Sequence, residues 1–194
     1  MGQLGFYFDA DNCIGCHCCQ VACKDANRLE VGVDFRHVTS YCTGSGFTPR
    51  MYHMSIACNH CESPACVANC PTGAMYKDDE TGLVLHDDDA CIGCQSCVEA
   101  CPYGEPVLIE SEGIVKKCDT CLRLREKGEQ PSCVASCPQR VLEFGDIDEL
   151  RAAHQGEGLV ADCAVLPASS TTTPNLVMRI KDCMTDTDFD QIVL

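Results

Sequence analysis

Cysteine is the residue type with most chemistry to offer in this sequence of 194 residues, which contains twenty of them. Sixteen fall into four groups of four, and each group begins with a C-x2-C pair. In chain order the groups are Cys13, Cys16, Cys19 and Cys23; Cys58, Cys61, Cys66 and Cys70; Cys91, Cys94, Cys97 and Cys101; and Cys118, Cys121, Cys133 and Cys137. Thiolates at such spacing are ligands for zinc or for iron–sulfur clusters, so the pattern indicates metal binding.

The spacing within the groups favours iron–sulfur clusters over zinc. The third group reads C-x2-C-x2-C-x3-C and is followed by Pro102, which is the run of bacterial ferredoxins. Three cysteines on a tight turn reach three iron corners of one 4Fe-4S cube, and the fourth, on the next helical turn, points toward a second cluster. Zinc ribbons instead use C-x2-C pairs with long gaps. The sequence therefore predicts four 4Fe-4S clusters.

Four cysteines remain outside these groups: Cys18, Cys42, Cys163 and Cys183. Cys18 lies inside the first group and competes with Cys19 for the same iron, and the spacing favours Cys19 because this choice reproduces the third group. We expect the other three to be free thiols. A disulfide framework is not expected, because residues 1–10 have neither the basic start nor the long apolar run of an export signal.

The composition excludes several partners and leaves the chain short of ordinary core residues. Fourteen Lys and Arg against 29 Asp and Glu give a formal net charge of −15, so we expect neither a nucleic acid nor an acidic lipid surface as partner. Hydrophobic residues make up 45% of the chain, but this share includes the twenty cysteines, and there is no tryptophan. Groups bound by the cysteines are therefore expected to supply part of the core. No segment approaches the ~20 apolar residues of a membrane helix.

Short strands and one helix are expected around the cysteine groups. Residues 6–8 and 141–144 are predicted strands, and residues 74–85 are a predicted β-hairpin with a turn that contains glycine. Residues 148–154 are predicted to form a short helix, with Asp146 as its N-cap.

The remaining organisation is less determined by pattern. Residues 24–57 and 156–194 show no clear period and are expected to be irregular segments that wrap a partner and become ordered on binding it. The first group resembles the third, and the second resembles the fourth, so the chain contains two ferredoxin-like units. A tandem duplication pairs the first group with the second and the third with the fourth. The short hairpin linker instead favours the second with the third, and spacing leaves both pairings open.

Longer stretches make the sequence recognisable as a member of a family. They are Cys58-Asn-His-Cys-Glu-Ser-Pro-Ala-Cys, Cys91-Ile-Gly-Cys, Ala100-Cys-Pro-Tyr-Gly, Lys117-Cys-Asp-Thr-Cys, Phe144-Gly-Asp-Ile-Asp-Glu-Leu-Arg and Thr173-Pro-Asn. From Phe6 to about Asn175 the chain closely resembles the four-cluster iron–sulfur electron-transfer (beta) subunits of the dimethyl sulfoxide reductase family of molybdopterin oxidoreductases. The resemblance implies an α+β fold of two interlocked bacterial-ferredoxin-like modules with irregular wrapping segments.

The resemblance also implies how the groups share the clusters. Cluster 1 is held by Cys13, Cys16, Cys19 and Cys137; cluster 2 by Cys23, Cys118, Cys121 and Cys133; cluster 3 by Cys58, Cys61, Cys66 and Cys101; and cluster 4 by Cys70, Cys91, Cys94 and Cys97. Residues 1–50 with 103–194 are expected to form the module with the first and fourth groups, and residues 51–102 the module with the second and third. Some relatives lack one ligand of the third group and hold a three-iron cluster, but here Cys94 is present.

The expected function is electron transfer without catalysis. The sequence shows no nucleophile–base pair and no open metal position, so substrate chemistry falls to a partner. The resemblance implies a large molybdopterin (bis-MGD) catalytic subunit, with or without a membrane anchor subunit, and a quinol or soluble electron donor. The alternative is a freestanding polyferredoxin or an accessory electron carrier of a hydrogenase or formate–hydrogen lyase. We expect synthesis in the cytoplasm without an export signal, and a final site there or wherever an exported partner carries the chain.

Five polar residues beside the cysteines are candidates for adjusting cluster potentials. His17 and His60 lie inside cysteine groups, and Lys24, Lys116 and Lys117 flank proposed ligands. A nearby cation favours the more negative, reduced state of a cluster. The alternative is that these side chains only pack in loops or face solvent.

Overall fold

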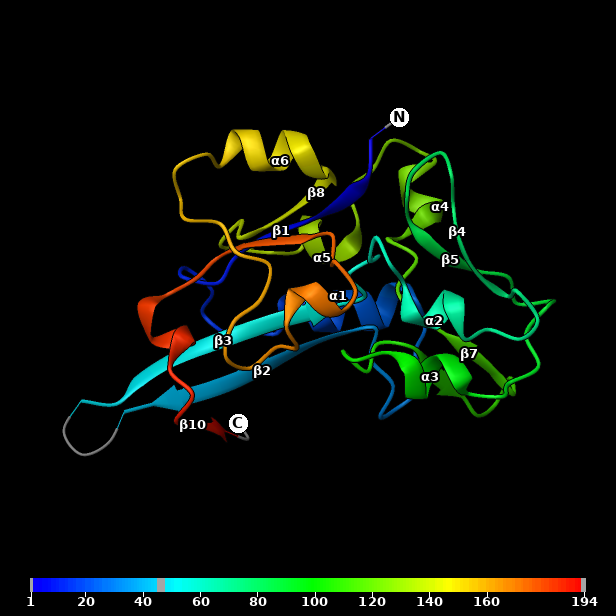
Figure 1. Cartoon of the computed structure of the whole chain (residues 1–194), viewed down its shortest axis with the longest axis horizontal. Coiled ribbons are helices and arrows are strands. Elements are labelled where there is room, and N and C mark those ends of the chain that lie inside the picture. Colours follow the sequence, from blue (N-terminus) through cyan, green and yellow to red (C-terminus); the bar gives the residue numbers. More distant parts are fainter. Residues whose placement is uncertain (1, 45–47, 193–194) are drawn as a thin grey trace.

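The computed structural model describes residues 2–44 and 48–192 of the chain. In this part the strands form two three-stranded sheets and two separate hairpins, with short helices between them (Figure 1). In chain order the elements are β1 (Leu4–Asp9), α1 (Cys18–Ala26), β2 (Arg36–Thr43), β3 (Arg50–Ala57), α2 (Ala65–Ala68), β4 (Met75–Lys77), β5 (Val84–His86), α3 (Ser96–Ala100), β6 (Val107–Ile109), β7 (Ile114–Lys116), α4 (Leu122–Arg125), α5 (Ser132–Ala135), β8 (Leu142–Asp146), α6 (Ile147–Ala153), the 3-10 helix η1 (Ser169–Thr171), β9 (Leu176–Arg179), the 3-10 helix η2 (Asp182–Thr185) and β10 (Phe189–Ile192). The expected α+β class is confirmed.

The first sheet has the strand order β8–β1–β9 and contains both strands that were predicted at residues 6–8 and 141–144. β1 runs antiparallel to β8, with Phe6 opposite Phe144, and parallel to β9, with Phe6 opposite Leu176. Phe6 is buried, and the centres of the Phe6 and Phe144 rings are 5.0 Å apart. Phe6 belongs to the largest apolar cluster of the described residues, and Phe144 packs against this cluster.

Helix α6 packs on this sheet and confirms the predicted helix (Figure 1). The carboxylate of Asp146 accepts hydrogen bonds from the backbone N–H groups of Asp148 and Glu149, at 3.0 and 3.2 Å. Asp146 is therefore the N-cap, as expected. The apolar side chains of the helix are buried with residues of β1 and β9.

The second sheet corrects the expectation that residues 24–57 are irregular. β2 and β3 form a long antiparallel hairpin from Arg36 opposite Ala57 to Thr43 opposite Arg50, and in Figure 1 this hairpin runs from the middle of the molecule toward the lower left. The buried positions of β2 include Arg36, Ser40 and Thr43. Because polar residues occupy buried positions, the strand shows no apolar alternation in the sequence. Residues 45–47 of the segment lie outside the described residues.

The C-terminal part corrects the same expectation for residues 156–194. β9 adds to β1 in parallel, and β10 adds to β2 in antiparallel orientation. Leu176, Val177 and Met178 are buried, so this part of the tail belongs to the core of the chain itself. Its strands join strands far away in sequence, and the one nearer pairing is a single bridge between Met178 and Val160, so no local hairpin signal announces them. Residues 193–194 lie outside the described residues.

Two small hairpins position the second and third cysteine groups. β4 and β5 form the hairpin that was predicted at residues 74–85, and β6 and β7 form another that was not predicted. Val115 of β7 is buried together with Met75 and Val84 of the first hairpin. The predicted module boundary between residues 50 and 51 therefore separates β2 from its partner β3, and the boundary at 102 separates β7 from its packing partners.

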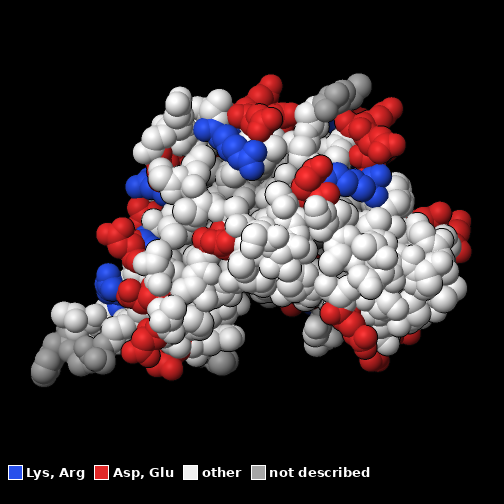
Figure 2. All heavy atoms as spheres, in the orientation of Figure 1, with Lys and Arg blue, Asp and Glu red and all other residues white. Residues whose placement is uncertain are grey.

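Acidic side chains are spread around the face of the molecule shown in Figure 2, whereas the middle of this face carries few charged side chains. The exposed apolar residues include Ile14 and Ile92, which occupy equivalent places in the loops of the first and third groups. Their side chains can contact a partner. None of the helices within residues 2–44 and 48–192 combines the length and apolar character needed to cross a membrane.

Candidate metal-cluster sites

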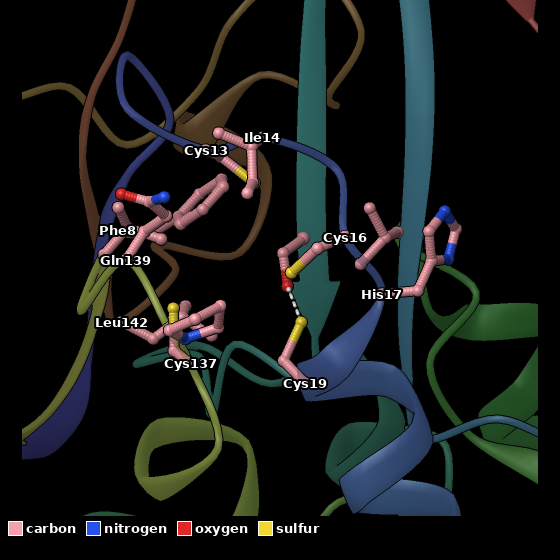
Figure 3. Close-up of a pocket in the computed structure, with 13 residues that line it drawn as sticks. Phe8, Cys13, Ile14, Cys16, His17, Cys19, Cys137, Gln139 and Leu142 are labelled. Carbon is pink, nitrogen blue, oxygen red and sulfur yellow. Dashed lines mark hydrogen bonds between the residues drawn. The ribbon is translucent and has the colours of Figure 1, made fainter.

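The first candidate site lies between the loop before α1 and the segment after α5 (Figure 3). Cys13 and Cys16 come from that loop, Cys19 from the first turn of α1, and Cys137 from the residues just after α5. These four cysteines line one cavity with an empty volume of about 330 Å³. Apolar side chains supply most of the remaining wall: Phe8, Ile14, Val38, Val141 and Leu142. Cys18 is exposed and does not line this cavity.

Two further cavities are built in the same way. The cysteines of one are Cys58, Cys61, Cys66 and Cys101, around an empty volume of about 350 Å³. The cysteines of the other are Cys70, Cys91, Cys94 and Cys97, around about 280 Å³. In all three cavities, three cysteines come from one group and the fourth comes from another. Their similar size and composition are what a single type of occupant requires.

Of the four cysteines assigned to cluster 2, Cys23 and Cys133 come from the packed helices α1 and α5, and Cys118 and Cys121 follow β7. Burial raises the pKa of the Cys23 thiol to about 12, and the nearby Cys133 and Cys121 contribute to the shift. The pKa of Cys118 is raised well above its usual value, first by burial and then by Cys23 and Cys133. Cys118 and Cys121 also line a broad groove, so this set opens onto the surface on one side.

The arrangement of the sulfur atoms fits a cluster better than a single ion. Among the described residues, no three His, Cys, Asp or Glu side chains are placed to share one metal ion. A cube with iron at four corners needs its ligands spread around a cavity instead. None of the twenty cysteines forms a disulfide. Backbone N–H groups of Met75 and Thr120 donate to Cys70 Sγ and Cys118 Sγ, both at 3.4 Å, and such hydrogen bonds stabilise the negative charge of ligated sulfur.

A left-handed backbone turn shapes the loops of the first and third groups. Gly15 and Gly93 both have φ of 65°, and two residues later His17 and Gln95 have φ of 59° and 61°, directly before α1 and α3 begin. At Gly93, a Cβ atom would lie 2.2 Å from the carbonyl oxygen of Gly113. Glycine is required there because both the backbone angle and the neighbouring backbone exclude a side chain.

The five polar residues noted beside the cysteines divide into two buried and three half-buried ones. His60 is fully buried and its Nδ1 accepts a hydrogen bond from the Val84 N–H at 3.1 Å. Lys117 is also buried, and its ammonium group donates to the carbonyl oxygens of Val84 and Cys118. The other three make contacts nearer the surface: His17 with Gln20, Lys24 with Asp34, and Lys116 with Asp88 and Glu112. Of the five, His60 and Lys117 therefore lie inside the protein beside cysteines.

Two buried charged residues, Arg36 and Glu105, are not singled out by sequence reasoning. Arg36 Nη1 donates to the carbonyl oxygen and to the hydroxyl of Ser55, both at 3.1 Å. The Ser55 hydroxyl lies 3.2 Å from Cys19 Sγ, the contact drawn as a dashed line in Figure 3. Burial raises the pKa of the Glu105 carboxyl to about 8. No spacing rule connects Arg36 with the cysteines, so only the fold brings it to them.

Comparison with known protein families identifies the same type of domain. A family described as a 4Fe-4S dicluster domain matches residues 49–147, and one described as a 4Fe-4S binding domain matches residues 10–30. Together these two ranges contain all four cysteine groups.

Relatives extend the similarity to most of the chain. It is 45% identical to the B subunit of anaerobic dimethyl sulfoxide reductase from Escherichia coli strain K12, over 91% of this chain and 88% of that protein. It is 43% identical to the protein of the same name from Haemophilus influenzae, over 92% and 90% of the two proteins. It is 40% identical to the thiosulfate reductase electron transfer subunit of Salmonella typhi, over 76% of this chain and 78% of that protein.

Proposed function

The protein belongs to the family of iron–sulfur electron-transfer subunits that includes the B subunit of anaerobic dimethyl sulfoxide reductase, and on this premise we propose that it holds four 4Fe-4S clusters. As in this family, it transfers electrons and is not itself catalytic. The proposed ligands are the cluster 1, 2, 3 and 4 sets that the sequence analysis assigned. The alternative of a freestanding polyferredoxin is less favoured, because the similarity to these subunits covers nearly the whole chain.

The observation that carries the proposal is the exchange of cysteines between groups. Each of three cavities is lined by three cysteines of one group and one of another, which is the pattern of two-cluster ferredoxins. The fourth set is supported by the raised thiol pKa values of Cys23 and Cys118, to which Cys133 contributes in both cases after burial.

When bound, 4Fe-4S clusters supply one-electron transfer. The cysteine thiolates hold them, and the surrounding side chains determine how much water and charge they meet. At the cluster 1 set, Phe8 and Leu142 limit the approach of water. Backbone N–H groups of Met75 and Thr120 donate to sulfur in the cluster 4 and cluster 2 sets. These contacts support a distinct environment, and hence a distinct potential, at each set.

We also propose two interlocked ferredoxin-like modules, with boundaries that follow the packing. The first and fourth groups contribute cysteines to one buried apolar cluster, and the second and third groups to another. A third apolar cluster contains cysteines of the first, second and fourth groups and supports the interlocking. Residues 2–57 with 117–192 form the first module in this proposal, and residues 58–116 form the second.

The proposed partner is a molybdopterin-containing catalytic subunit that docks beside the cluster 1 set. Ile14 and Val21 are exposed on the loop and helix that carry the exposed Cys16, and an apolar surface there supports a protein contact. Ile92 and the exposed Cys94 support a second contact, at which an electron donor meets the cluster 4 set. That donor is a membrane anchor subunit or a soluble carrier. In this proposal the chain assembles with its partner in the cytoplasm, and it is exported only if the partner is exported.

Cluster content tests the proposal most directly. Protein purified without oxygen is expected to contain about sixteen iron and about sixteen sulfide per chain. Replacement of Cys94 by serine should remove or alter one cluster signal in electron paramagnetic resonance (EPR) and leave the other three. Replacement of Cys42, which belongs to no set, is the control and should leave iron content unchanged. About twelve iron in the unaltered protein, or a loss of two signals in C94S, would contradict the ligand sets.

The partner is tested in the complex. The large subunit should co-purify with the chain, and C94S should abolish substrate reduction driven by the physiological donor. The same complex should keep its activity with a small reduced dye that reaches the catalytic subunit directly. Purification of the chain as a stable monomer without any large subunit would favour the freestanding polyferredoxin.

A further inference from the structure

Arg36, the first residue of β2, is a buried cation, and the buried acid that senses its charge is Glu105. It is 3% exposed, and among the described residues it takes part in no ion pair within 4.0 Å. Its Nη1 bonds to Ser55, its guanidinium carbon lies 5.0 Å from the centre of the Phe6 ring, and its buried Nε has no hydrogen-bond partner. A buried charge left in this state is expensive. Burial raises the pKa of the Glu105 carboxyl to about 8, so at neutral pH this acid is mostly uncharged and does not balance Arg36. The position of Arg36 therefore calls for further negative charge.

The groups that face Arg36 belong to two cluster sets. Its guanidinium pKa is raised, because Cys133, Cys19, Cys118 and Cys23 favour the charged form more strongly than burial opposes it. Cys19 belongs to the cluster 1 set, and the other three belong to the cluster 2 set. Cys19 and Cys23 are four residues apart and so lie on one face of α1, on which β2 packs. Arg36 is thus placed between two neighbouring sets.

We propose that Arg36 sets the reduction potentials of clusters 1 and 2 by raising both of them, an inference that rests on the ligand sets proposed above. With four thiolates, a 4Fe-4S centre carries a charge of about −2, and one electron from the donor side makes it about −3. A fixed cation stabilises the more negative state more than the less negative one. Burial preserves this effect because solvent screening is weak there.

Ser55 carries part of the effect to cluster 1. Because Arg36 donates to the Ser55 oxygen, the hydroxyl hydrogen is left to donate to Cys19 Sγ at 3.2 Å. A hydrogen bond to a ligating sulfur also raises the potential of a cluster. Cluster 2 receives the charge of Arg36 without this hydrogen bond. Lys117 is a separate buried cation beside Cys58 and Cys66 of the cluster 3 set, so that set keeps its own positive charge when Arg36 is replaced.

The test is a redox titration of the purified complex, followed by EPR. Arg36→Met removes the charge and keeps a side chain of similar length. The midpoint potentials of clusters 1 and 2 should fall. At a fixed ambient potential, the ratio of reduced to oxidised cluster should decrease at least tenfold, which corresponds to about 59 mV for one electron. Clusters 3 and 4 should shift less. Ser55→Ala should lower the potential of cluster 1 alone. Arg50→Met, at an exposed ion pair with Asp186, is the control for net charge and should shift none of the four.

Iron content is measured first, because it separates this inference from the ligand sets. Four signals and about sixteen iron in R36M, with unchanged potentials for clusters 1 and 2, would overturn the role of Arg36 and leave the proposed cluster content intact. An equal shift of all four clusters would also overturn it. If R36M does not assemble, R36K and R36Q are measured instead. The proposal is supported if the potentials of clusters 1 and 2 fall in R36Q but not in R36K. Unchanged potentials of both clusters in R36Q refute it.

Discussion

At the scale of single residues, Cys18 and Cys19 are adjacent in sequence but take opposite positions. Cys19 is buried and lines the cavity of the cluster 1 set, whereas Cys18 is exposed at the start of α1. Cys19→Ser is therefore expected to remove or alter the signal of cluster 1, and Cys18→Ser to leave it unchanged. Iron analysis and EPR of the two anaerobically purified variants measure this. Loss of the signal in C18S with retention in C19S would reverse the assignment.

At the scale of elements, the loop of the third group depends on Gly93 and on the hairpin β6–β7. Gly93→Ala would place a Cβ against the Gly113 carbonyl, in addition to the strain of a left-handed backbone. We expect loss of the cluster 4 signal and of its share of iron. Gly104→Ala is the matched control, because Gly104 has φ of 70° with nothing within 4 Å of the added atom. It should cost only about 1–2 kcal/mol and keep all four signals. Equal effects of the two variants would show that strain alone decides.

Helix α6 carries a pH-dependent contact at its C-terminal end. The His154 ring stacks on Tyr7 at 3.6 Å, and its two nitrogens lie 3.1 Å from carboxylates of Glu143 and Glu157. Burial lowers the pKa of His154, but hydrogen bonds to Glu157 and Glu143 outweigh this effect, and the pKa is raised. Because the pKa of His154 is raised in the folded state, its protonated ring stabilises the fold at pH values below the ordinary histidine pKa of ~6.5. This stabilisation is lost as the pH rises through the raised pKa.

The melting temperature of His154→Gln relative to the unaltered protein measures this dependence. The deficit should be larger at pH 5.5 than at pH 8.5. Arg151→Gln, which removes an exposed side chain of the same helix that pairs with Asp148, serves as control and should show a difference that does not vary with pH. A deficit in H154Q that grows toward alkaline pH would contradict the sign of the shift.

At the scale of the whole molecule, the proposed ligands are part of the core. Three of the four apolar clusters in the described residues contain such cysteines. Removal of iron would leave thiol-lined cavities inside the core. The free energy of cluster binding therefore contributes directly to the stability of the fold. Chelation of iron under reducing conditions should abolish most of the far-ultraviolet circular dichroism. A cooperative thermal transition retained in the iron-free chain would contradict this.

The sequence by itself determined the parts of this protein that depend on local spacing. Three cysteines of a group lie on one turn, so their spacing indicates the cluster type without any knowledge of the fold. The hairpin at residues 74–85, the strands at 6–8 and 141–144 and the capped helix after Asp146 are also local, and all were predicted. Strong similarity to a family then indicated electron transfer.

Only the tertiary structure decided what depends on residues far apart in the chain. Repeats left the pairing of the groups open, and the ligand sets came only from the family resemblance. In the fold, Cys137 lines the same cavity as Cys13, and Cys101 lines the same cavity as Cys58. In β2 the strand pattern is hidden, because Arg36 and Ser40 take buried positions. In β3, Tyr52, Met54 and Ile56 alternate with polar residues, which is a strand pattern that the sequence analysis missed. β9 and β10 likewise find their partners across more than a hundred residues. Such contacts are set by packing and charge between distant segments, and no spacing within a segment records them.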